Sequence, residues 1–170
     1  MMTPLDKLKR NVEATNFHRH NIQTIGISII SVGELGFSYT LGASQSGLPD
    51  LIATNVSQAA ALHIFNTIFQ SWLKEGYRDG RITDLFESPE SGRDMAIYIK
   101  PIEYNDHLID NYVTQAYKFY RMLPEFVSPK HGIRYVQVFA PDNQGKTQFE
   151  AGFNMQYHQM LVEEPIGNLQ

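Results

Sequence analysis

Two carboxylates near the C-terminus have the residue type and the setting that acid–base chemistry needs. Asp142 follows a run of mostly apolar residues, RYVQVFA at 134–140, and Glu150 lies shortly after it. A carboxylate at the end of a buried strand can project into a cleft and accept a proton from a substrate. We therefore predict Asp142 and Glu150 as the candidate catalytic residues. The turn sequence PDNQG explains Asp142 as well, because Asp and Asn bind their own backbone in turns.

The stretch from 37 to 50 offers groups that could bind a ligand. A β-rich run, FSYTLG, leads into the serine- and glycine-rich segment ASQSGLPD, whose backbone N–H groups could face an anion or a phosphate. The spacing matches neither a P-loop nor a dinucleotide-binding fingerprint. A hairpin turn is the alternative interpretation, since Gly and Pro satisfy turn geometry without a ligand. The candidate ligand-binding residues in this stretch are Tyr39, Thr40, Ser44 and Ser46.

Tyr117 is a further candidate for ligand binding. It lies in a predicted helix over 106–123, in which Tyr112 and Tyr120 share the apolar face. Packing alone accounts for those two tyrosines. Tyr117 falls off the apolar face, and a phenol offers both stacking surface and a hydrogen bond. We therefore add Tyr117 to the ligand-binding candidates.

The histidines do not predict a metal site. His18 and His20 are two residues apart, so on a strand both could reach one ion, but a third ligand would have to come from far along the chain. The chain has no cysteine, and no histidine pair has the HExxH spacing. The segment around His18 and His20 is polar and charged, which favours a solvated surface. We predict no bound metal and no cofactor.

The overall composition is that of an ordinary globular domain. The 170 residues, 42% of them hydrophobic, suffice for a buried core. A formal net charge of −4, with Lys and Arg scattered along the chain, argues against nucleic-acid binding. The polar N-terminus and the lack of a long apolar run argue against a secretory signal and a membrane span. Together with the absence of cysteine, these features predict a soluble, cytoplasmic protein.

Hydrophobic periodicity predicts the elements that position these residues. The most regular pattern is the helix that begins after Ser57 and ends at Gly76, with apolar residues at three- and four-residue intervals. In the second helix, over 106–123, Asp106 is a suitable N-cap and Pro124 ends the pattern. Strands are predicted at 24–32, 37–43, 51–56, 81–86, 94–104 and 134–140.

These elements predict an α+β fold, a small antiparallel sheet or partly open barrel with two main helices packed on it. The first three strands follow one another closely, so we expect them to form an antiparallel meander. The predicted organisation is an N-terminal helical segment at residues 1–22, a single α+β domain at 23–160 and a loose C-terminal tail at 161–170.

Three stretches carry a family resemblance: FSYTLG at 37–42, GLPDLI at 47–52 and VQVFAPD at 136–142, with Gly145 after the last. In this order and spacing the chain resembles the domain-of-unknown-function family 4262 of bacteria and their phages, from about Ile25 to Phe153. In that family an aromatic residue often stands at the position of Ala140, and a Pro-Trp pair at 148–149, so the chain resembles a divergent member. The resemblance implies domain boundaries and no particular reaction.

The candidate residues support two hypotheses about function. The first is a binding or interaction module with a small polar cleft near Tyr39, Thr40 and Asp142, whose partner is a small molecule or a protein. The second is a metal-independent enzyme that acts on a small polar or nucleotide-like metabolite and uses a carboxylate as base. Tyrosine-rich surfaces and an apolar C-terminal stretch also allow a homodimer, since two-fold dimers are the commonest oligomers.

Overall fold

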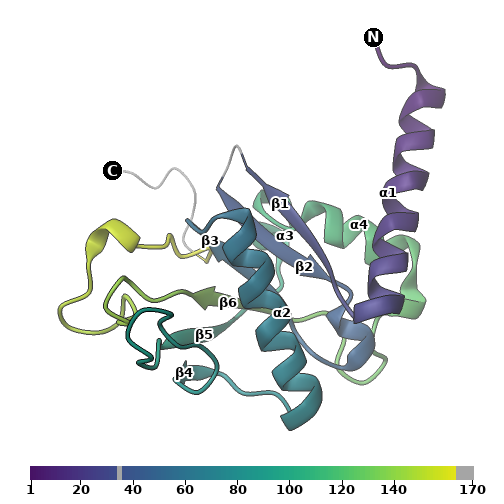
Figure 1. The fold of residues 1–170 in the computed structure, drawn as a ribbon. Coiled ribbons are helices and arrows are strands. Elements are labelled where there is room, and N and C mark those ends of the chain that lie inside the picture. The colour runs from purple at the N-terminus through teal and green to yellow at the C-terminus, as the bar shows by residue number, and fades with distance from the viewer. Residues whose placement is uncertain (34–35, 164–170) are drawn as a thin grey trace.

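A computed structural model gives the fold of the chain and describes residues 1–33 and 36–163 (Figure 1). None of the helices in this part combines the length and the apolar character that crossing a membrane would need. The α-helices are α1 (Pro4–Ile25), α2 (Gln58–Glu75), α3 (Asp106–Asn111) and α4 (Thr114–Met122). The strands are β1 (Ser28–Val32), β2 (Phe37–Leu41), β3 (Asp50–Thr54), β4 (Gly80–Ile82), β5 (Ile97–Ile102) and β6 (Tyr135–Phe139). Short 3-10 helices are η1 (Ala43–Ser46), η2 (Pro124–Phe126) and η3 (Met155–Tyr157).

The strands form one open sheet in the order β1-β2-β3-β6-β5-β4, which confirms the α+β class. The neighbouring pairs are antiparallel except β3 and β6, which run parallel with Asp50 opposite Tyr135. The predicted meander of the first three strands is therefore present as β1-β2-β3. The parallel pair is a departure from an all-antiparallel sheet. It joins segments separated by α2, β4, β5, α3 and α4, and a parallel neighbour requires such a long connection.

Helices cover both faces of the sheet (Figure 1). On one face, α2 packs through residues such as Phe65, and on the other, α4 packs through residues such as Tyr120. Because side chains alternate along a strand, Leu51 and Ile52 of β3 enter these two different cores. Burial from both sides explains why β2, β3 and β6 are buried at every position.

The single helix predicted over 106–123 is wrong, because the structure divides it into α3 and α4. The backbone leaves helical geometry at Tyr112 (φ −132°) and Val113 (φ −107°, ψ 36°). The break allows these two consecutive residues to be buried together, whereas neighbours on a continuous helix point about 100° apart. The Thr114 hydroxyl donates to the Ile109 carbonyl at 2.7 Å, which satisfies an acceptor near the break.

The N-terminal helix is longer than the predicted segment at residues 1–22, since α1 continues to Ile25. Thr3 caps it in a reciprocal capping box with Asp6. Gly26 ends it in the left-handed region at φ 95°, where its N–H donates to the Ile22 carbonyl at 2.9 Å. As a result, β1 starts at Ser28, four residues later than the predicted strand.

Residues 148–163, here called the C-terminal strap, return to the sheet beside β3 and β6. The Gln137 side chain donates to the Met160 carbonyl at 2.7 Å and accepts from the Val162 N–H at 3.0 Å. The Gln159 side chain donates to the Val138 carbonyl of β6 and accepts from the Ala140 N–H just after that strand, where β3 no longer pairs with β6. The Gln159 side chain thus satisfies backbone groups that lack a strand neighbour, and the Gln137 side chain binds the strap backbone. Together they hold the strap in place.

The predicted C-terminal tail, residues 161–170, begins inside this strap. Val162 is fully buried, and Glu163 forms an ion pair with Lys100 of β5. Residues 164–170 lie outside the described part of the chain, so the prediction of a loose tail there stays a prediction.

Candidate functional site

The polar group with the most unusual environment in the core is Asp50, at the start of β3. Its side chain is fully buried and accepts three hydrogen bonds. The Thr40 hydroxyl and the Ala43 N–H donate to Oδ1 at 2.7 and 3.1 Å, and the Tyr120 hydroxyl donates to Oδ2 at 2.5 Å. The Gly42 N–H in turn donates to the Tyr120 oxygen at 2.6 Å. One carboxylate therefore ties together β2, η1, β3 and α4.

Burial raises the pKa of Asp50 to about 7, although its three donors favour the charged form. A carboxyl that titrates near neutral pH has a suitable pKa for proton transfer. Asp50 and Thr40 are 0% exposed, however, and Tyr120 is 2% exposed, so no path leads a substrate to these atoms in this structure. The contacts of Asp50 give it a role in holding the fold.

Three of the predicted ligand-binding residues lie in or beside this buried network. Thr40 is part of it, as described above. Tyr39 is buried, and burial raises the pKa of Tyr39 to about 12. The Ser44 hydroxyl donates to the Gly132 carbonyl at 2.8 Å and accepts from the Ser128 N–H at 2.9 Å, so it ties η1 to the loop after η2. The predicted ligand-binding role of these residues stays a prediction.

The other two predicted ligand-binding residues are more accessible. Ser46 is exposed at the end of η1. Tyr117 is half-buried on α4, where its hydroxyl accepts a hydrogen bond from Arg121 at 3.2 Å. Neither of them makes a hydrogen bond to Asp50 among the described contacts.

Asp142 organises the loop that joins β6 to the strap. Its carboxylate accepts from the N–H groups of Gln144, Lys146 and Asn154, each at 2.9 Å. Burial opposes the charged form, but these hydrogen bonds together lower the pKa of Asp142 below its ordinary value. The turn interpretation of Asp142 accounts for the contacts with Gln144 and Lys146, and the contact with Asn154 ties this turn to the strap. The predicted catalytic role of Asp142 stays a prediction.

Glu150 caps the start of the strap region in a similar way. Its Oε2 accepts from the Thr147 N–H at 2.6 Å and from the Thr147 hydroxyl at 2.9 Å, and its Oε1 lies 3.2 Å from Arg81. The Thr147 N–H first, and then the Thr147 hydroxyl and Arg81, lower the pKa of Glu150 against the opposing effect of burial. Its predicted role as an acid or base likewise stays a prediction.

The candidates predicted from the sequence do not share one cleft. Asp50 and Thr40 lie at the N-terminal end of β6, because Asp50 is the partner of Tyr135. Asp142 lies beyond Phe139, the last residue of that strand. The strand alone spans about 13 Å at the usual rise of about 3.3 Å per residue. The structure therefore separates Thr40 from Asp142.

His18 and His20 lie on α1, so the two-residue spacing directs them to different sides of a helix rather than to one face of a strand. His18 Nδ1 is 2.6 Å from the Ser28 hydroxyl, and burial lowers the pKa of His18. His20 is exposed. Within residues 1–33 and 36–163 no three His, Asp or Glu side chains come together in a group that could hold a metal ion.

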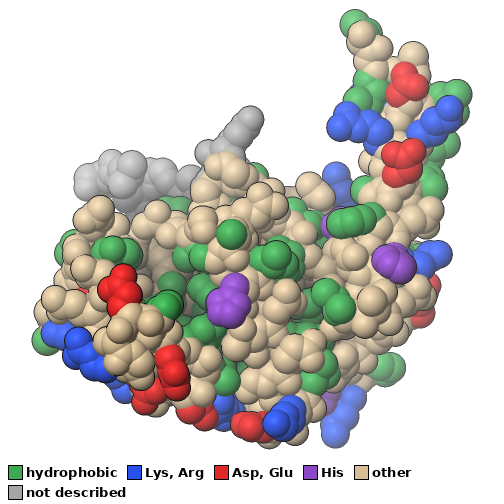
Figure 2. Space-filling model, viewed as in Figure 1, with side chains coloured by type: hydrophobic (Ala, Val, Ile, Leu, Met, Phe, Trp, Pro, Cys, Tyr) green, Lys and Arg blue, Asp and Glu red, His purple; other side chains and the backbone are tan. Residues whose placement is uncertain are grey.

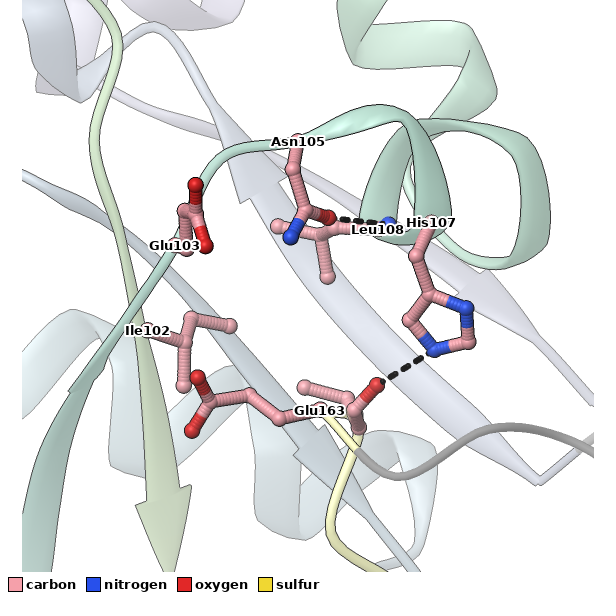
Figure 3. Close-up of a pocket in the computed structure, with 7 residues that line it drawn as sticks. Ile102, Glu103, Asn105, His107, Leu108 and Glu163 are labelled. Carbon is pink, nitrogen blue, oxygen red and sulfur yellow. Dashed lines mark hydrogen bonds between the residues drawn. The ribbon is translucent and has the colours of Figure 1, made fainter. Parts of the chain in front are cut away.

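A pocket of about 340 Å³ opens where the end of β5, the start of α3 and the strap meet (Figure 3). The His107 ring holds the strap, because its Nε2 lies 3.0 Å from the Val162 carbonyl oxygen. Asn105 caps α3 by accepting from the Leu108 N–H at 3.0 Å. The lining residues are Ile102, Glu103, Asn105, His107, Leu108, Val162 and Glu163.

The pocket combines an apolar wall with an acidic rim. Leu108 and Val162 are buried in the adjoining core. Glu103 is exposed and has no ion-pair partner among the described residues, whereas Glu163 is paired with Lys100. Figure 3 shows Glu103, Asn105 and Glu163 around one common space. This pocket is therefore an open cavity with both apolar and acidic lining residues.

None of the pocket residues is among the candidates predicted from the sequence. The sequence from Glu103 to His107 indicates the start of a helix and not a binding site. Glu163 is about 60 residues further along the chain, so the sequence does not show that it lies nearby. The available signal is a polar loop between two elements, because such loops often carry binding residues. Asp50 was also absent from the predicted candidates, since the turn pattern GLPD gives no indication that this carboxylate is buried.

The comparisons with known proteins identify a family. The family model described as "Domain of unknown function (DUF4262)" matches residues 18–154, which is most of the chain. The chain belongs to the DUF4262 family. The predicted family is therefore confirmed. No curated protein and no solved structure matches the chain.

Some of the features described above lie inside the region that matches the DUF4262 model, and others lie outside it. It includes the Asp50 network and the β5–α3 side of the pocket. Val162 and Glu163, which close the pocket, lie beyond its end, and the first four turns of α1 lie before its start. The pocket of this DUF4262 domain is thus built partly by chain outside the matched region.

Proposed function

We propose that this DUF4262 domain is a binding module whose pocket takes a small organic cation. The observation that carries the proposal is the Glu103 carboxylate, which lies on the pocket rim without an ion-pair partner among the described residues. A free carboxylate beside an apolar wall suits a ligand that has an ammonium or guanidinium group on an apolar stem.

The sign of the preferred charge follows from both glutamates of the pocket. An anionic ligand would meet the carboxylates of Glu103 and Glu163, whereas a cation would be attracted by both. Lys100 offsets part of the charge of Glu163, so Glu103 supplies most of the attraction. Because the pocket is small and partly open, we expect a dissociation constant on the order of a millimolar.

The alternative hypothesis, a metal-independent enzyme acting on a small polar or nucleotide-like metabolite, stays a prediction. It relied on Asp142 and Glu150, whose carboxylates are engaged by the surrounding loop. Asp50 has the pKa of a base but lies fully buried. No contact in the described residues favours this alternative over binding.

Titration with a primary alkylamine, followed by NMR chemical shifts or calorimetry, tests the proposal. We expect saturable binding of the amine and none of the alkyl carboxylate of equal length. Glu103→Gln should weaken amine binding about tenfold, which corresponds to about 1.4 kcal/mol. Lys100→Met should strengthen it, because it removes the cation that pairs with Glu163.

Glu125→Gln is the matched control. Glu125 is exposed on η2 and is not a pocket residue, so this variant changes the net charge equally and should bind the amine like the wild type. Equal binding of amine and carboxylate, or equal effects of the two Gln variants, would contradict the proposal.

A further inference from the structure

The N-terminal helix projects from the body of the molecule without a partner (Figure 1). Residues 1–14 are all exposed, and contact with the body begins further along α1. There His18 and Asn21 hydrogen-bond the Ser28 hydroxyl of β1, and Ile22 is buried in the core. About three helical turns of α1 therefore extend into solvent.

This projecting part, residues 1–14, carries an apolar stripe. Leu5, Leu8 and Val12 follow one another at three- and four-residue intervals and are 60%, 59% and 51% exposed. At about 100° per residue they share one side of the helix, while the charged residues Asp6, Arg10 and Glu13 lie on the opposite side. Figure 2 shows hydrophobic and charged side chains together along this part of the molecule.

An unsupported helix of this length needs a partner to be stable. Isolated helices shorter than about 12–15 residues are marginal in water, and most helical stability in proteins comes from packing of the apolar face. The capping box at Thr3 contributes to the first turn only. By heptad spacing, Leu8 is followed on α1 by Thr15 and then by Ile22, which is buried in the core.

We propose that the projecting part of α1 pairs in antiparallel orientation with α1 of a second copy of this chain. In this arrangement Leu8 packs against the partner's Val12, and Leu5 packs against the partner's Thr15, the half-buried residue that directly follows the projecting part. Each residue pair occurs twice because the interface is two-fold symmetric. A helix pair of this size is at the small end of specific interfaces, so the dimer is weak and depends on protein concentration.

The charge distribution favours a second copy as the partner. The four basic and two acidic residues of α1 give it a charge of +2, and the ten basic and sixteen acidic residues elsewhere give −6. Antiparallel pairing brings the basic tip of each α1, with Lys7 and Lys9, towards the acidic body of the other copy.

Sedimentation equilibrium of the full chain over a range of concentrations tests the proposal. We expect a monomer–dimer equilibrium in the wild type. Leu8→Glu should raise the dimer dissociation constant at least about tenfold, because each of the two copies then brings a negative charge into the apolar interface. Phe17→Glu is the matched control: Phe17 is equally exposed, at 60%, but lies on the opposite side of α1, so its dimer should persist.

Disulfide cross-linking tests the orientation, and the chain has no cysteine of its own to interfere. Leu5→Cys mixed with Thr15→Cys should give the cross-linked heterodimer, whereas Leu5→Cys alone should stay uncross-linked, since its two copies lie about 15 Å apart. A monomer at all concentrations, an unchanged dimer in Leu8→Glu, or efficient cross-linking of Leu5→Cys alone would overturn the proposal. Binding of α1 to anionic vesicles with no dimer in solution would also overturn it, in favour of a membrane surface.

Discussion

At the scale of single residues, Asp50 is the clearest case of a side chain whose properties come from its surroundings. The residue type is an ordinary carboxylate, and only complete burial moves its pKa towards neutral pH. Its three donors come from β2, η1 and α4, so loss of any one of them would loosen a different contact. Because folding raises the pKa of Asp50, the stability of the protein should depend on pH.

We expect the contribution of Asp50 to stability to fall as pH rises from about 4 to about 7. Its pKa is raised from 3.8 to about 7 on folding, so in this window the folded protein binds a proton that the unfolded chain has released. The full effect is of the order of 4 kcal/mol. The measurement is the difference in the free energy of unfolding between the wild type and Asp50→Asn, from urea unfolding at several pH values.

The difference in the free energy of unfolding between the wild type and Asp50→Asn cancels the contributions of other titrating groups. Burial lowers the pKa of His18, so His18 adds stability that is lost as pH falls below its unfolded value of 6.5, which is the opposite slope. This slope is common to the wild type and to Asp50→Asn. A difference that stays constant from pH 4 to pH 8 would show that Asp50 is ionised in the folded protein.

At the scale of elements, the junction of α1, β2 and η1 depends on the close approach of backbone and side chain at Gly42. Gly42 has φ 103°, in the left-handed region, and a methyl group there would lie 2.4 Å from Cγ1 of Ile22. Ile22 is the residue of α1 that enters the core. The absence of a side chain at one position thus determines how the N-terminal helix joins the sheet.

Gly42→Ala should destabilise the protein by about 2–4 kcal/mol, because strain in the backbone adds to overpacking against Ile22. Gly92→Ala is the control: Gly92 also has a positive φ, of 68°, but open space surrounds it, so the cost there is about 1 kcal/mol. Chemical denaturation of both variants gives the comparison. Equal losses would mean that the contact with Ile22 relaxes at no cost.

At the scale of the whole molecule, residues 1–33 and 36–163 form a packed body from which the N-terminal helix projects. The body has cores on both faces of its sheet, and the strap closes it through Gln137 and Gln159. The projecting residues 1–14 make no buried contact with it. Folding of the body should therefore be separable from the association that we propose for α1.

Deletion of residues 1–14 should leave the free energy of unfolding within about 0.5 kcal/mol of the full chain, when both are measured at a concentration too low for dimers. The same deletion should abolish self-association. Thermal or urea unfolding followed by circular dichroism provides the measurement. A loss of several kcal/mol would instead mean that the N-terminal helix supports the body.

Local patterns in the sequence determined the α+β class, the α2 helix and the first three strands. The Ser57 cap and the apolar stripe of α2 are local features, as is the hairpin spacing of β1 and β2, so they are visible along the chain. The three stretches that resemble the DUF4262 family are also local, and the family match confirms them.

Tertiary structure alone decided the parallel pairing of β3 with β6, the break between α3 and α4, the burial of Asp50 and the location of the pocket. Each of these depends on contacts between segments far apart in sequence: Asp50 meets Tyr120 of α4, and the pocket forms where the strap returns to α3. Sequence periodicity reports which face of an element is apolar, but not which distant element covers it. The chemistry of Asp142 and Glu150 was visible as residue types, and only the folded loop revealed which donors surround them.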